Sequence, residues 1–404
     1  MGHDKLPAFV RPLILFGAFD RHNFGDLLLG EIAAALIRPQ PVTFAGLVER
    51  DMSAYGARRV RAITALAREW AGDVADVVHV GGELLTCTLY EAAVMLQTDD
   101  EAQAVIARYD ADPQRGHAWA ARQLGLDQAV AYLVHRDFFR RSGVFTYLGV
   151  GGVELDRLPE AARAQVHAGL AAANFVWVRD QETHCHLQMV GVPALLAPDP
   201  AELTSALFGT VVREQASCAR QAAIHERFPG GYLAVQFSAD FGDDATLDVI
   251  GRQLVQIHRE QGLGIVLFRT GAAPWHDRLD VYRRLVQGTA GLGAVIFEAL
   301  DIWEICALLA GSCGTIGSSL HARIVAEAFN RPAASLVRKS SERSKVGAYV
   351  ATWIPGALAT VVSPEEMVSA WRQALTFEPG NSRQLQQAIA AANIFREARG
   401  LPPL

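Results

Sequence analysis

The sequence predicts an α/β protein in which two doubly wound parallel sheets face a central cleft. Short apolar stretches with the composition of buried strands alternate along the chain with stretches long enough to form helices. This alternation runs from residue 13 to 197, weakens between 203 and 230, and resumes at residue 232. The chain has 404 residues, 50% of them hydrophobic. A chain of this length is too long for one compact core and fits two domains.

The first domain is predicted over residues 1–205, from the local pattern of each element. Short apolar runs predict strands at 13–17, 42–46, 76–80, 145–150, 175–178 and 194–197. Helical patterns occupy 27–37, 54–71, 161–173 and 182–190, and residues 84–141 are mostly helical with breaks at 98–101 and 112–116. Because strands that alternate with helices form covered parallel sheets, ligands are expected beyond the carboxyl ends of these strands.

The second domain is predicted over residues 231–378, after a linker at 206–230 that contains a polar helix at 215–228 and a Pro-Gly-Gly breaker. Strands are expected at 232–237, 264–268, 294–297, 333–337 and in a short run from 315. Helices are expected at 247–261, 277–286, 302–310 and 364–375. The remaining segment, 379–404, is expected to form a helix over 383–399 that packs back on the first domain.

Composition excludes several classes of protein. The net charge is −6 and the arginines are spread along the chain, so a nucleic-acid partner is not expected. Five cysteines without a C-x-x-C pair fit the reduced thiols of a cytoplasmic protein. The chain has no apolar run of the roughly 20 residues that span a membrane, and its first residues lack the apolar core of a signal peptide. We therefore expect no integral membrane segment and a cytoplasmic location.

Residues 315–332 are the most informative segment. They are typical of a short strand, a small-residue turn and a helix closed by Pro332, with His321 where the helix begins. A helix start offers free N–H groups and partial positive charge to an anion, and a histidine can move a proton near neutral pH. This equipment suits an enzyme for a phosphorylated substrate, whereas a capped helix with a polar histidine in its first turn is the alternative.

Other candidates also follow predicted strands. Gly25 permits close backbone approach in the first turn, beside Asn23 and Asp26, and Asp26 could cap the helix, bind a sugar hydroxyl or take up a proton. Glycine turns after the strands that end at 80 and 150 could present main-chain amides to a ligand or simply make tight turns; they include Gly81, Gly82, Gly151 and Gly152. No glycine pattern of a dinucleotide site or P-loop occurs.

Three further features carry basic or metal-binding side chains. Arg179 follows a buried strand and could clamp a carboxylate or phosphate, or form a structural ion pair. The basic stretch 338–345 could meet an anionic ligand or be a solvated loop. His184-Cys-His186 has no third ligand at a recognisable spacing, so no metal site is predicted.

Taken together, these motifs occur in a familiar order. They are the G-x-x-x-x-x-N-x-G-D turn at 17–26, Gly-Gly at 81–82, Val-Arg-Asp at 178–180, Gly-Val at 191–192, Pro-Asp at 198–199 and Ser-Ser-Leu-His-Ala at 318–322. From Gly17 to Lys345 the chain resembles the polysaccharide pyruvyl transferase family. The resemblance implies a GT-B-like fold of two Rossmann-like domains, with the acceptor on the first domain and the donor on the second. It also implies transfer of the enolpyruvyl unit of phosphoenolpyruvate to sugar hydroxyls as a ketal.

The resemblance implies two small partners, an anionic donor and a glycan acceptor, with phosphoenolpyruvate as co-substrate and no cofactor. His321 would be the general acid and base, and Asp26 joins it as the second predicted catalytic residue. The predicted substrate-binding residues are Asn23, Gly25, Gly81, Gly82, Gly151, Arg179, Ser318, Ser319, Leu320, Arg323 and Lys345.

Two positions depart from the family pattern. Ser319 stands where the family usually has arginine, and serine cannot make a bidentate anion contact. Glu83 stands where a third glycine is common, which puts a negative charge close to the expected cleft. A GT-B glycosyltransferase that uses a nucleotide sugar, and a non-catalytic member with a binding role, therefore remain the alternative functions.

Overall fold

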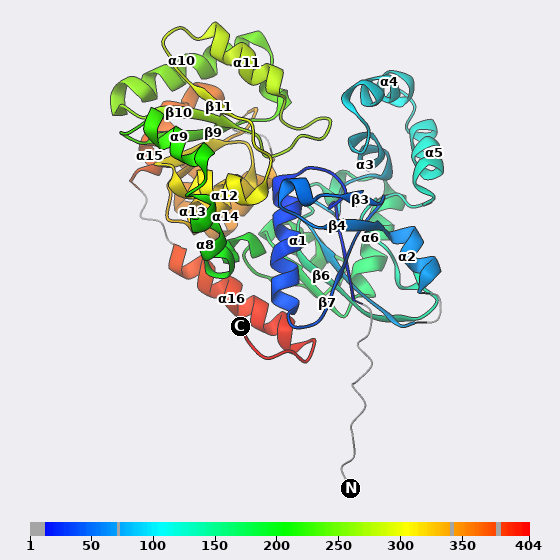
Figure 1. Ribbon diagram of the computed structural model, residues 1–404. Helices are drawn as coiled ribbons and strands as arrows, with labels where there is room; N and C mark the ends of the chain where they lie inside the picture. The colour runs from blue at the N-terminus through cyan, green and yellow to red at the C-terminus, as the bar shows by residue number, and fades with distance from the viewer. Residues whose placement is uncertain (1–12, 71–72, 340–342, 377–380) are drawn as a thin grey trace.

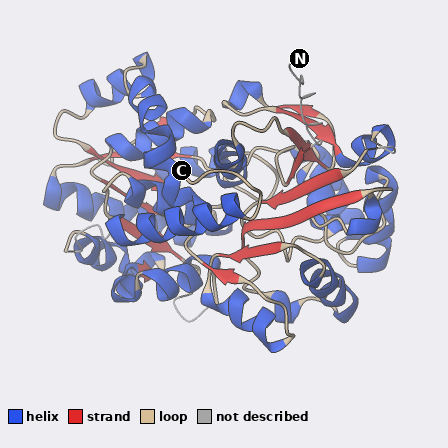
Figure 2. Cartoon of the chain, turned by 90° about the horizontal axis from the view of Figure 1, so that it is seen from below, coloured by secondary structure: helices blue, strands red, loops and turns tan. Residues whose placement is uncertain are grey.

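The computed structural model of the protein describes residues 13–70, 73–339, 343–376 and 381–404. Within these residues the long sheets are an eight-stranded one, in the order β3-β4-β2-β1-β5-β6-β7-β8, and a six-stranded one, in the order β11-β10-β9-β12-β13-β14. Helices lie on both sides of the strands (Figures 1 and 2). Neighbouring strands run parallel except for the edge pair β3 and β4. The predicted class is confirmed.

The N-terminal lobe is built on the eight-stranded sheet. Its strands are β1 (Leu13–Phe16), β2 (Thr43–Gly46), β3 (Arg50–Asp51), β4 (Arg59–Ala62), β5 (Ala75–Val80), β6 (Ser142–Val150), β7 (Phe175–Val178) and β8 (Leu195–Leu196). Its helices are α1 (Phe24–Ile37), α2 (Ile63–Glu69), α3 (Leu89–Met95), α4 (Asp99–Tyr109), α5 (Pro113–Leu124), α6 (Glu160–Ala171) and α7 (Gln181–Met189). The central strand β1 pairs with β2 on one side and β5 on the other, which places the switch point of the sheet there.

The C-terminal lobe is built on the six-stranded sheet. Its strands are β9 (Tyr232–Gln236), β10 (Gly264–Phe268), β11 (Val295–Phe297), β12 (Gly314–Gly317), β13 (Ala333–Leu336) and β14 (Val361–Val362). Its helices are α10 (Asp244–Gln261), α11 (Leu279–Gly288), α12 (Ile302–Gly311), α13 (Leu320–Ala328), α14 (Lys345–Trp353) and α15 (Met367–Ala374). Here β9 lies between β10 and β12, so the carboxyl ends of β9 and β12 flank the second switch point.

Three predicted elements differ from those observed. The helix expected at 54–71, whose last residue lies outside the described residues, is α-helical only in α2 and has one 3-10 turn at Ser53–Tyr55. Residues 59–62 instead join the sheet as β4, with Val60 buried beside the exposed Arg59. The breaks expected at 98–101 and 112–116 are helix starts, where Thr98 and Asp112 cap α4 and α5. The basic stretch ends in α14, which begins at Lys345 after the cap Ser344, and its residues 340–342 lie outside the described residues.

Between the lobes the chain forms two helices, α8 (Thr204–Gln215) and α9 (Ala219–Arg227). The last helix, α16 (Asn381–Glu397), returns to the N-terminal lobe, as the red end of the ribbon shows in Figure 1. There the ring of Phe395 packs near that of Phe175, and Arg396 Nη1 donates to the carbonyl of Leu36 at 2.6 Å. The predicted boundary at 378 lies outside the described residues. None of the helices in the described part of the chain is long and apolar enough to cross a membrane.

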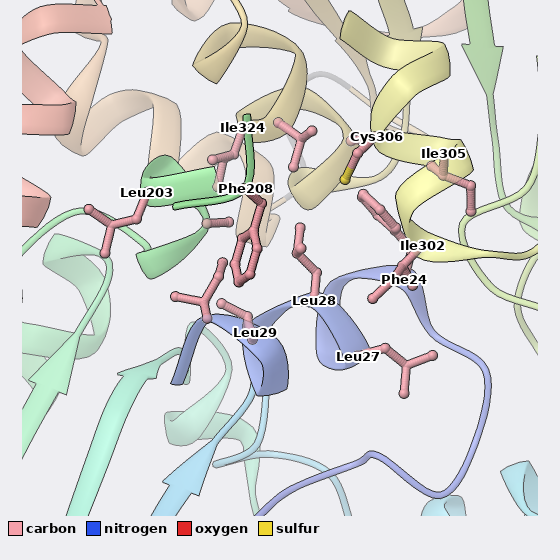
Figure 3. Close-up of a cluster of buried hydrophobic side chains, with 14 of the residues drawn as sticks. Phe24, Leu27, Leu28, Leu29, Leu203, Phe208, Ile302, Ile305, Cys306 and Ile324 are labelled. Carbon is pink, nitrogen blue, oxygen red and sulfur yellow. The ribbon is translucent and has the colours of Figure 1, made fainter. Parts of the chain in front are cut away.

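One apolar core joins the two lobes. Helix α1 of the N-terminal lobe packs its leucines against α8, α12 and α13, and Figure 3 shows Leu28 of α1 beside Phe208 of α8. The first residues of α1 take part, since Phe24 is fully buried and its amide donates to the carbonyl of Thr270 at 2.6 Å. This packing holds the first turn of α1 against the C-terminal lobe.

Candidate active site

A cleft of about 680 Å³ opens between the lobes where the two switch points face each other. The N-terminal lobe contributes residues that follow β1 and β5, and the C-terminal lobe contributes residues that follow β9, β10 and β12. This is the expected ligand position for parallel sheets. Among the predicted site residues, those that line the cleft are Asn23, Asp26, Gly82, Arg179, Ser318, Ser319, Leu320, His321 and Lys345.

His321 lies in the first turn of α13, as predicted. Ser319 is the N-cap: its hydroxyl accepts from the amide of Ala322 at 3.3 Å, and its own amide donates to Gln236 Oε1 at 2.9 Å. Leu320 is 1% exposed and anchors the turn in the core. The imidazole reaches across to α1, where a Cβ added to Gly25 would lie 1.9 Å from His321 Nδ1. Glycine at 25 is therefore what admits the imidazole.

A buried carboxylate stands behind the imidazole. Asp199 Oδ2 lies 3.4 Å from His321 Nε2 and accepts from Arg179 Nη1 at 3.1 Å. Although burial acts to raise it, the charges of His321 and Arg179 hold the pKa of Asp199 below its ordinary value. Asp199 lies between Pro198 and Pro200, and it caps the turn that follows by accepting from the amide of Ala201 at 2.9 Å. Its contact with His321 depends on tertiary packing.

Arg179 is 1% exposed and carries a second carboxylate. Its Nη2 donates to Glu83 Oε2 at 2.7 Å, and Glu83 Oε1 accepts from the amide of Val153. The negative charge expected from Glu83 is thus paired within the N-terminal lobe. Because Glu83 and Asp199 both contact it, the Arg179 guanidinium is already neutralised by the protein.

The predicted glycines make room for this cluster. A Cβ on Gly82 would lie 2.7 Å from Arg179 Nη1, and one on Gly151 would lie 2.7 Å from Glu83 Oε2. Their amides are engaged as well, since Gly82 N donates to Asp26 Oδ1 at 3.4 Å and Gly151 N donates to the carbonyl of Gly82 at 2.6 Å. Gly81 takes φ 154° against the side chain of Leu84 and does not line the cleft.

A tyrosine and a glutamate form a layer beneath Asp199. The Tyr349 hydroxyl donates to Glu202 Oε1 at 2.8 Å and accepts from the amide of Asp199 at 3.3 Å. Burial, followed by the nearby Glu327 carboxylate, raises the pKa of Glu202 to about 8. Neither side chain was predicted to serve the site, because a lone tyrosine or glutamate carries no sequence signal for such a contact.

Asn23 and Asp26 have different roles in the structure, capping of α1 for Asn23 and contacts in the cleft for Asp26. Asn23 is the cap of α1, since its Oδ1 accepts from the amides of Gly25 and Asp26. Asp26 is free of the capping role and faces Gly82, with its Oδ2 3.8 Å from Arg21 Nη2. Asn23 also reaches the other lobe, where its Nδ2 lies 3.0 Å from His276 Nε2.

The segment from Trp275 to Asp277 forms part of the C-terminal wall. Asp277 is a buried anchor, because its carboxylate accepts from Gln236 Nε2 at 2.9 Å and from the amide of Thr270 at 2.6 Å. Burial raises the pKa of Asp277 to about 6. Burial, assisted by the charge of Arg21, lowers the pKa of His276 to about 4, so His276 is neutral near pH 7.

Among the predicted binding residues, those that do not line the cleft are Gly25, Gly81, Gly151 and Arg323. Arg323 does not line the cleft: its Nη1 donates to the hydroxyls of Ser335 and Thr360, and it pairs with Glu327 at 3.0 Å. Lys345 lines the cleft and opens α14. The Ser318 hydroxyl accepts from the amide of Ser238 at 3.1 Å. Across the described residues no three His, Cys, Asp or Glu side chains meet in a way that could hold a metal ion.

Comparison with known proteins agrees with this architecture. A family model described as polysaccharide pyruvyl transferase matches residues 129–340, which include Arg179, Asp199 and His321. No curated protein matches the chain. Solved structures of low sequence identity share the fold: UDP-GlcNAc 2-epimerase from Methanocaldococcus jannaschii (TM-score 0.56, 11% identity, covering 96% of this chain and 99% of that one) and UDP-N-acetylglucosamine 2-epimerase from Rickettsia bellii (0.55, 10%, 96% and 96%). MnaA from S. aureus, in a structure with UDP, gives 0.52 at 12% identity, with 97% and 98% covered. These likenesses show a GT-B-like fold.

Proposed function

The chain belongs to the polysaccharide pyruvyl transferase family, and from that premise we propose that it transfers the enolpyruvyl unit of phosphoenolpyruvate to hydroxyls of a sugar as a ketal. The observation that carries the proposal is the pair of His321 and Asp199, 3.4 Å apart at a helix start inside the interlobe cleft. A carboxylate beside an imidazole stabilises the protonated ring, and the start of α13 favours an anion.

The first step of the proposed reaction is a proton transfer. C3 of the enolpyruvyl group gains a proton, which leaves an oxocarbenium-like centre at C2. His321 is the proton donor in this proposal, because its ring lines the cleft and its Nε2 lies 3.4 Å from the Asp199 carboxylate. Arg179 holds Asp199 in place by its hydrogen bond to the same oxygen, and so acts as a positioning residue.

The remaining steps form the ketal. Two sugar hydroxyls each form a bond to C2 and each lose a proton, while the bond from C2 to the phosphate oxygen breaks and phosphate leaves with the electron pair. One hydroxyl proton balances the proton gained by C3, and the other leaves with phosphate or solvent. Asp26 is the proposed acceptor of a hydroxyl proton, since its carboxylate faces the cleft and does not cap α1. The positive charge near the starts of α13 and α14 would stabilise the departing phosphate.

The test is phosphate release from phosphoenolpyruvate on addition of glycan acceptors. We expect His321→Ala to lower the rate by about 10²–10⁴-fold, the usual contribution of a positioned acid–base group. His117→Ala is the matched control, because His117 lies on α5 and pairs with Asp127 outside the cleft. Absence of release across a broad acceptor panel would contradict the proposal.

A nucleotide-sugar transferase is the second candidate, favoured by the shared fold with MnaA, whose structure holds UDP. A thermal-shift comparison separates the two functions, because a bound ligand raises stability by mass action. Stabilisation by phosphoenolpyruvate and not by UDP supports the first candidate. A non-catalytic role would leave ligand binding intact in His321→Ala and would show no turnover with the wild-type protein.

A further inference from the structure

Six cationic side chains line the cleft, and most of them are already paired. Within the described residues, hydrogen bonds or close ion pairs join Arg157 to Glu154, Arg179 to Glu83 and Asp199, Arg338 to Asp243, and Arg343 to Asp156. A cation matched by a carboxylate offers little net charge to a ligand. Arg21 and Lys345 remain as cations that no carboxylate in the described part of the chain approaches within hydrogen-bond distance.

Arg21 is buried but incompletely satisfied. It is 6% exposed, and its Nη1 donates to the Tyr132 hydroxyl at 2.5 Å. Its Nη2 lies 3.8 Å from Asp26 Oδ2, too far for a hydrogen bond, and its Nε has no hydrogen-bond partner in the described structure. A guanidinium has five N–H donors, and leaving them unpaired away from water is costly. An anion in the cleft would supply the missing acceptors.

The surroundings of Arg21 hold it in place, while its closest carboxylate, that of Asp26, stays 3.8 Å away. Its guanidinium carbon lies 5.2 Å from the centre of the Tyr132 ring. The Tyr132 hydroxyl in turn donates to Asp20 Oδ1 at 3.2 Å, and Asp20 Oδ2 accepts from the amides of Leu47 and Val48. Asp20 therefore orients the tyrosine and does not contact Arg21 through an ion pair. A preorganised cation of this kind suits the binding of an anion.

Arg21 and Lys345 line the same cleft from opposite lobes. After burial, the positive charges of Arg21 and Lys345 both contribute to the lowered pKa of His276, which lies in the C-terminal wall. Across from them, Ser319 caps α13 with its hydroxyl and supplies no charge at that helix start. Among the described cations that line the cleft, Arg21 and Lys345 are thus the two least closely matched by a carboxylate.

We propose that Arg21 binds the carboxylate or phosphate of the donor together with Lys345, an assignment that rests on the proposed function for the identity of the donor. Arg21 presents a planar donor group that matches two oxygens of such an anion. Lys345 adds a flexible charge at the start of α14, where the N-terminal amides also favour an anion. The paired Arg179 serves the neighbouring imidazole instead.

The test measures binding of phosphoenolpyruvate, inorganic phosphate and UDP to the full chain by calorimetry. For Arg21→Gln we expect the Kd of phosphoenolpyruvate to rise by roughly 10–100-fold, the usual effect of losing a charge-assisted contact. The Kd of Arg21→Lys should lie between those of the wild type and Arg21→Gln, because lysine keeps the positive charge but lacks the planar guanidinium group. Arg343→Gln is the matched control, since Arg343 lines the same cleft but is paired with Asp156.

The outcomes separate this inference from the proposed function. If the folded Arg21→Gln variant binds phosphoenolpyruvate as tightly as the wild type, Arg21 does not bind the donor. The same conclusion follows if Arg343→Gln loses as much affinity as Arg21→Gln. In both cases phosphoenolpyruvate remains the proposed donor. If the wild-type chain binds UDP or phosphate but not phosphoenolpyruvate, and Arg21→Gln weakens that binding, then Arg21 binds anions and phosphoenolpyruvate is not the donor. If Arg21→Gln does not fold, the Arg21→Lys variant provides the test. Weaker binding of phosphoenolpyruvate at an unchanged melting temperature supports a role of Arg21 in donor binding, and unchanged binding overturns that role. Failure of the wild-type chain to bind any of the three anions overturns both.

Discussion

The two buried arginines of the N-terminal lobe, Arg179 and Arg21, differ in how their charge is compensated. Arg179 contacts Glu83 and Asp199 at 2.7 and 3.1 Å. Arg21 hydrogen-bonds only a neutral tyrosine among the described residues, and its nearest carboxylate, that of Asp26, is 3.8 Å away. Both line one cleft. The comparison teaches that one wall of the cleft uses its charges to fix geometry, whereas the other leaves positive charge available.

We call the first set, Glu83, Arg179, Asp199 and His321, the paired wall, and Arg21 with Lys345 the open wall. A fixed carboxylate and imidazole suit proton transfer, which needs orientation. Uncompensated cations suit the binding of an anion. Changes in the paired wall should therefore lower turnover with little effect on donor affinity, and changes in the open wall should do the reverse.

The largest expected effect on the paired wall comes from Asp199→Asn. The amide keeps the size of the side chain but removes the charge that stabilises protonated His321, so we expect kcat to fall by about 10²–10⁴-fold. Steady-state kinetics with phosphoenolpyruvate, alongside calorimetric binding, measure the two quantities separately. Asp127→Asn, on an exposed side chain that pairs with His117, is the control. A Kd that rises as steeply as kcat falls would break the distinction between the walls.

A smaller effect is expected from Gly25→Ala, which tests whether α1 positions the imidazole. The added methyl would lie 1.9 Å from His321 Nδ1, so the ring must move. Displacement of a reacting group by about 1 Å can cost about 10²-fold in rate. Gly288→Ala is the control, because a Cβ there meets nothing within 4 Å. Full activity of Gly25→Ala would show that the imidazole works from another position.

The smallest effect concerns stability and involves Glu202, beneath the paired wall. Its pKa is about 8 in the folded protein against an ordinary value of 4.5. As the pH rises, the Glu202 carboxyl loses its proton at a lower pH in the unfolded chain than in the folded protein. The contribution of Glu202 to the free energy of unfolding is therefore complete below pH 4.5 and is lost as the pH rises toward 8. Glu202→Gln should remove this loss, which is on the order of 1–3 kcal/mol.

Urea unfolding of both chains at pH 5.5 and pH 8.5 measures the effect. The stability of the variant relative to the wild type should increase with pH. Glu226→Gln, on the exposed surface of α9, should show no such trend. A difference between Glu202→Gln and the wild type that stays constant with pH would contradict the neutral state assigned to Glu202.

The sequence was most informative where a single strand, turn and helix fix a residue. His321 at the start of α13 and Lys345 beside the cleft belong to such local units. Arg323, only two positions after His321, points toward Ser335 because the turn of a helix carries successive side chains to different faces. Arg323 was among the binding residues predicted from the sequence, but tertiary packing directs its side chain to Ser335 and Thr360, and it does not line the cleft.

Pairings between distant segments were beyond the reach of the sequence. Asp199 meets His321, and Tyr349 meets Glu202, only because the lobes are packed together. The same holds for Arg21, whose burial against Tyr132 depends on the loop that follows α5. The strand β4 was mistaken for a helix because its short alternation gives a weak signal beside the helical run that follows.

The apolar core around α1 has a consequence for how the molecule comes apart. Because Leu28 and Phe24 are buried in the same cluster as Ile305 and Ile324 (Figure 3), melting either lobe exposes hydrocarbon belonging to the other. The two halves should then behave as one cooperative unit, with a single heat-absorption peak and no populated state in which only one half is folded. The catalytic proposals depend on that cooperativity, since the imidazole and the glycine that admits it come from different halves.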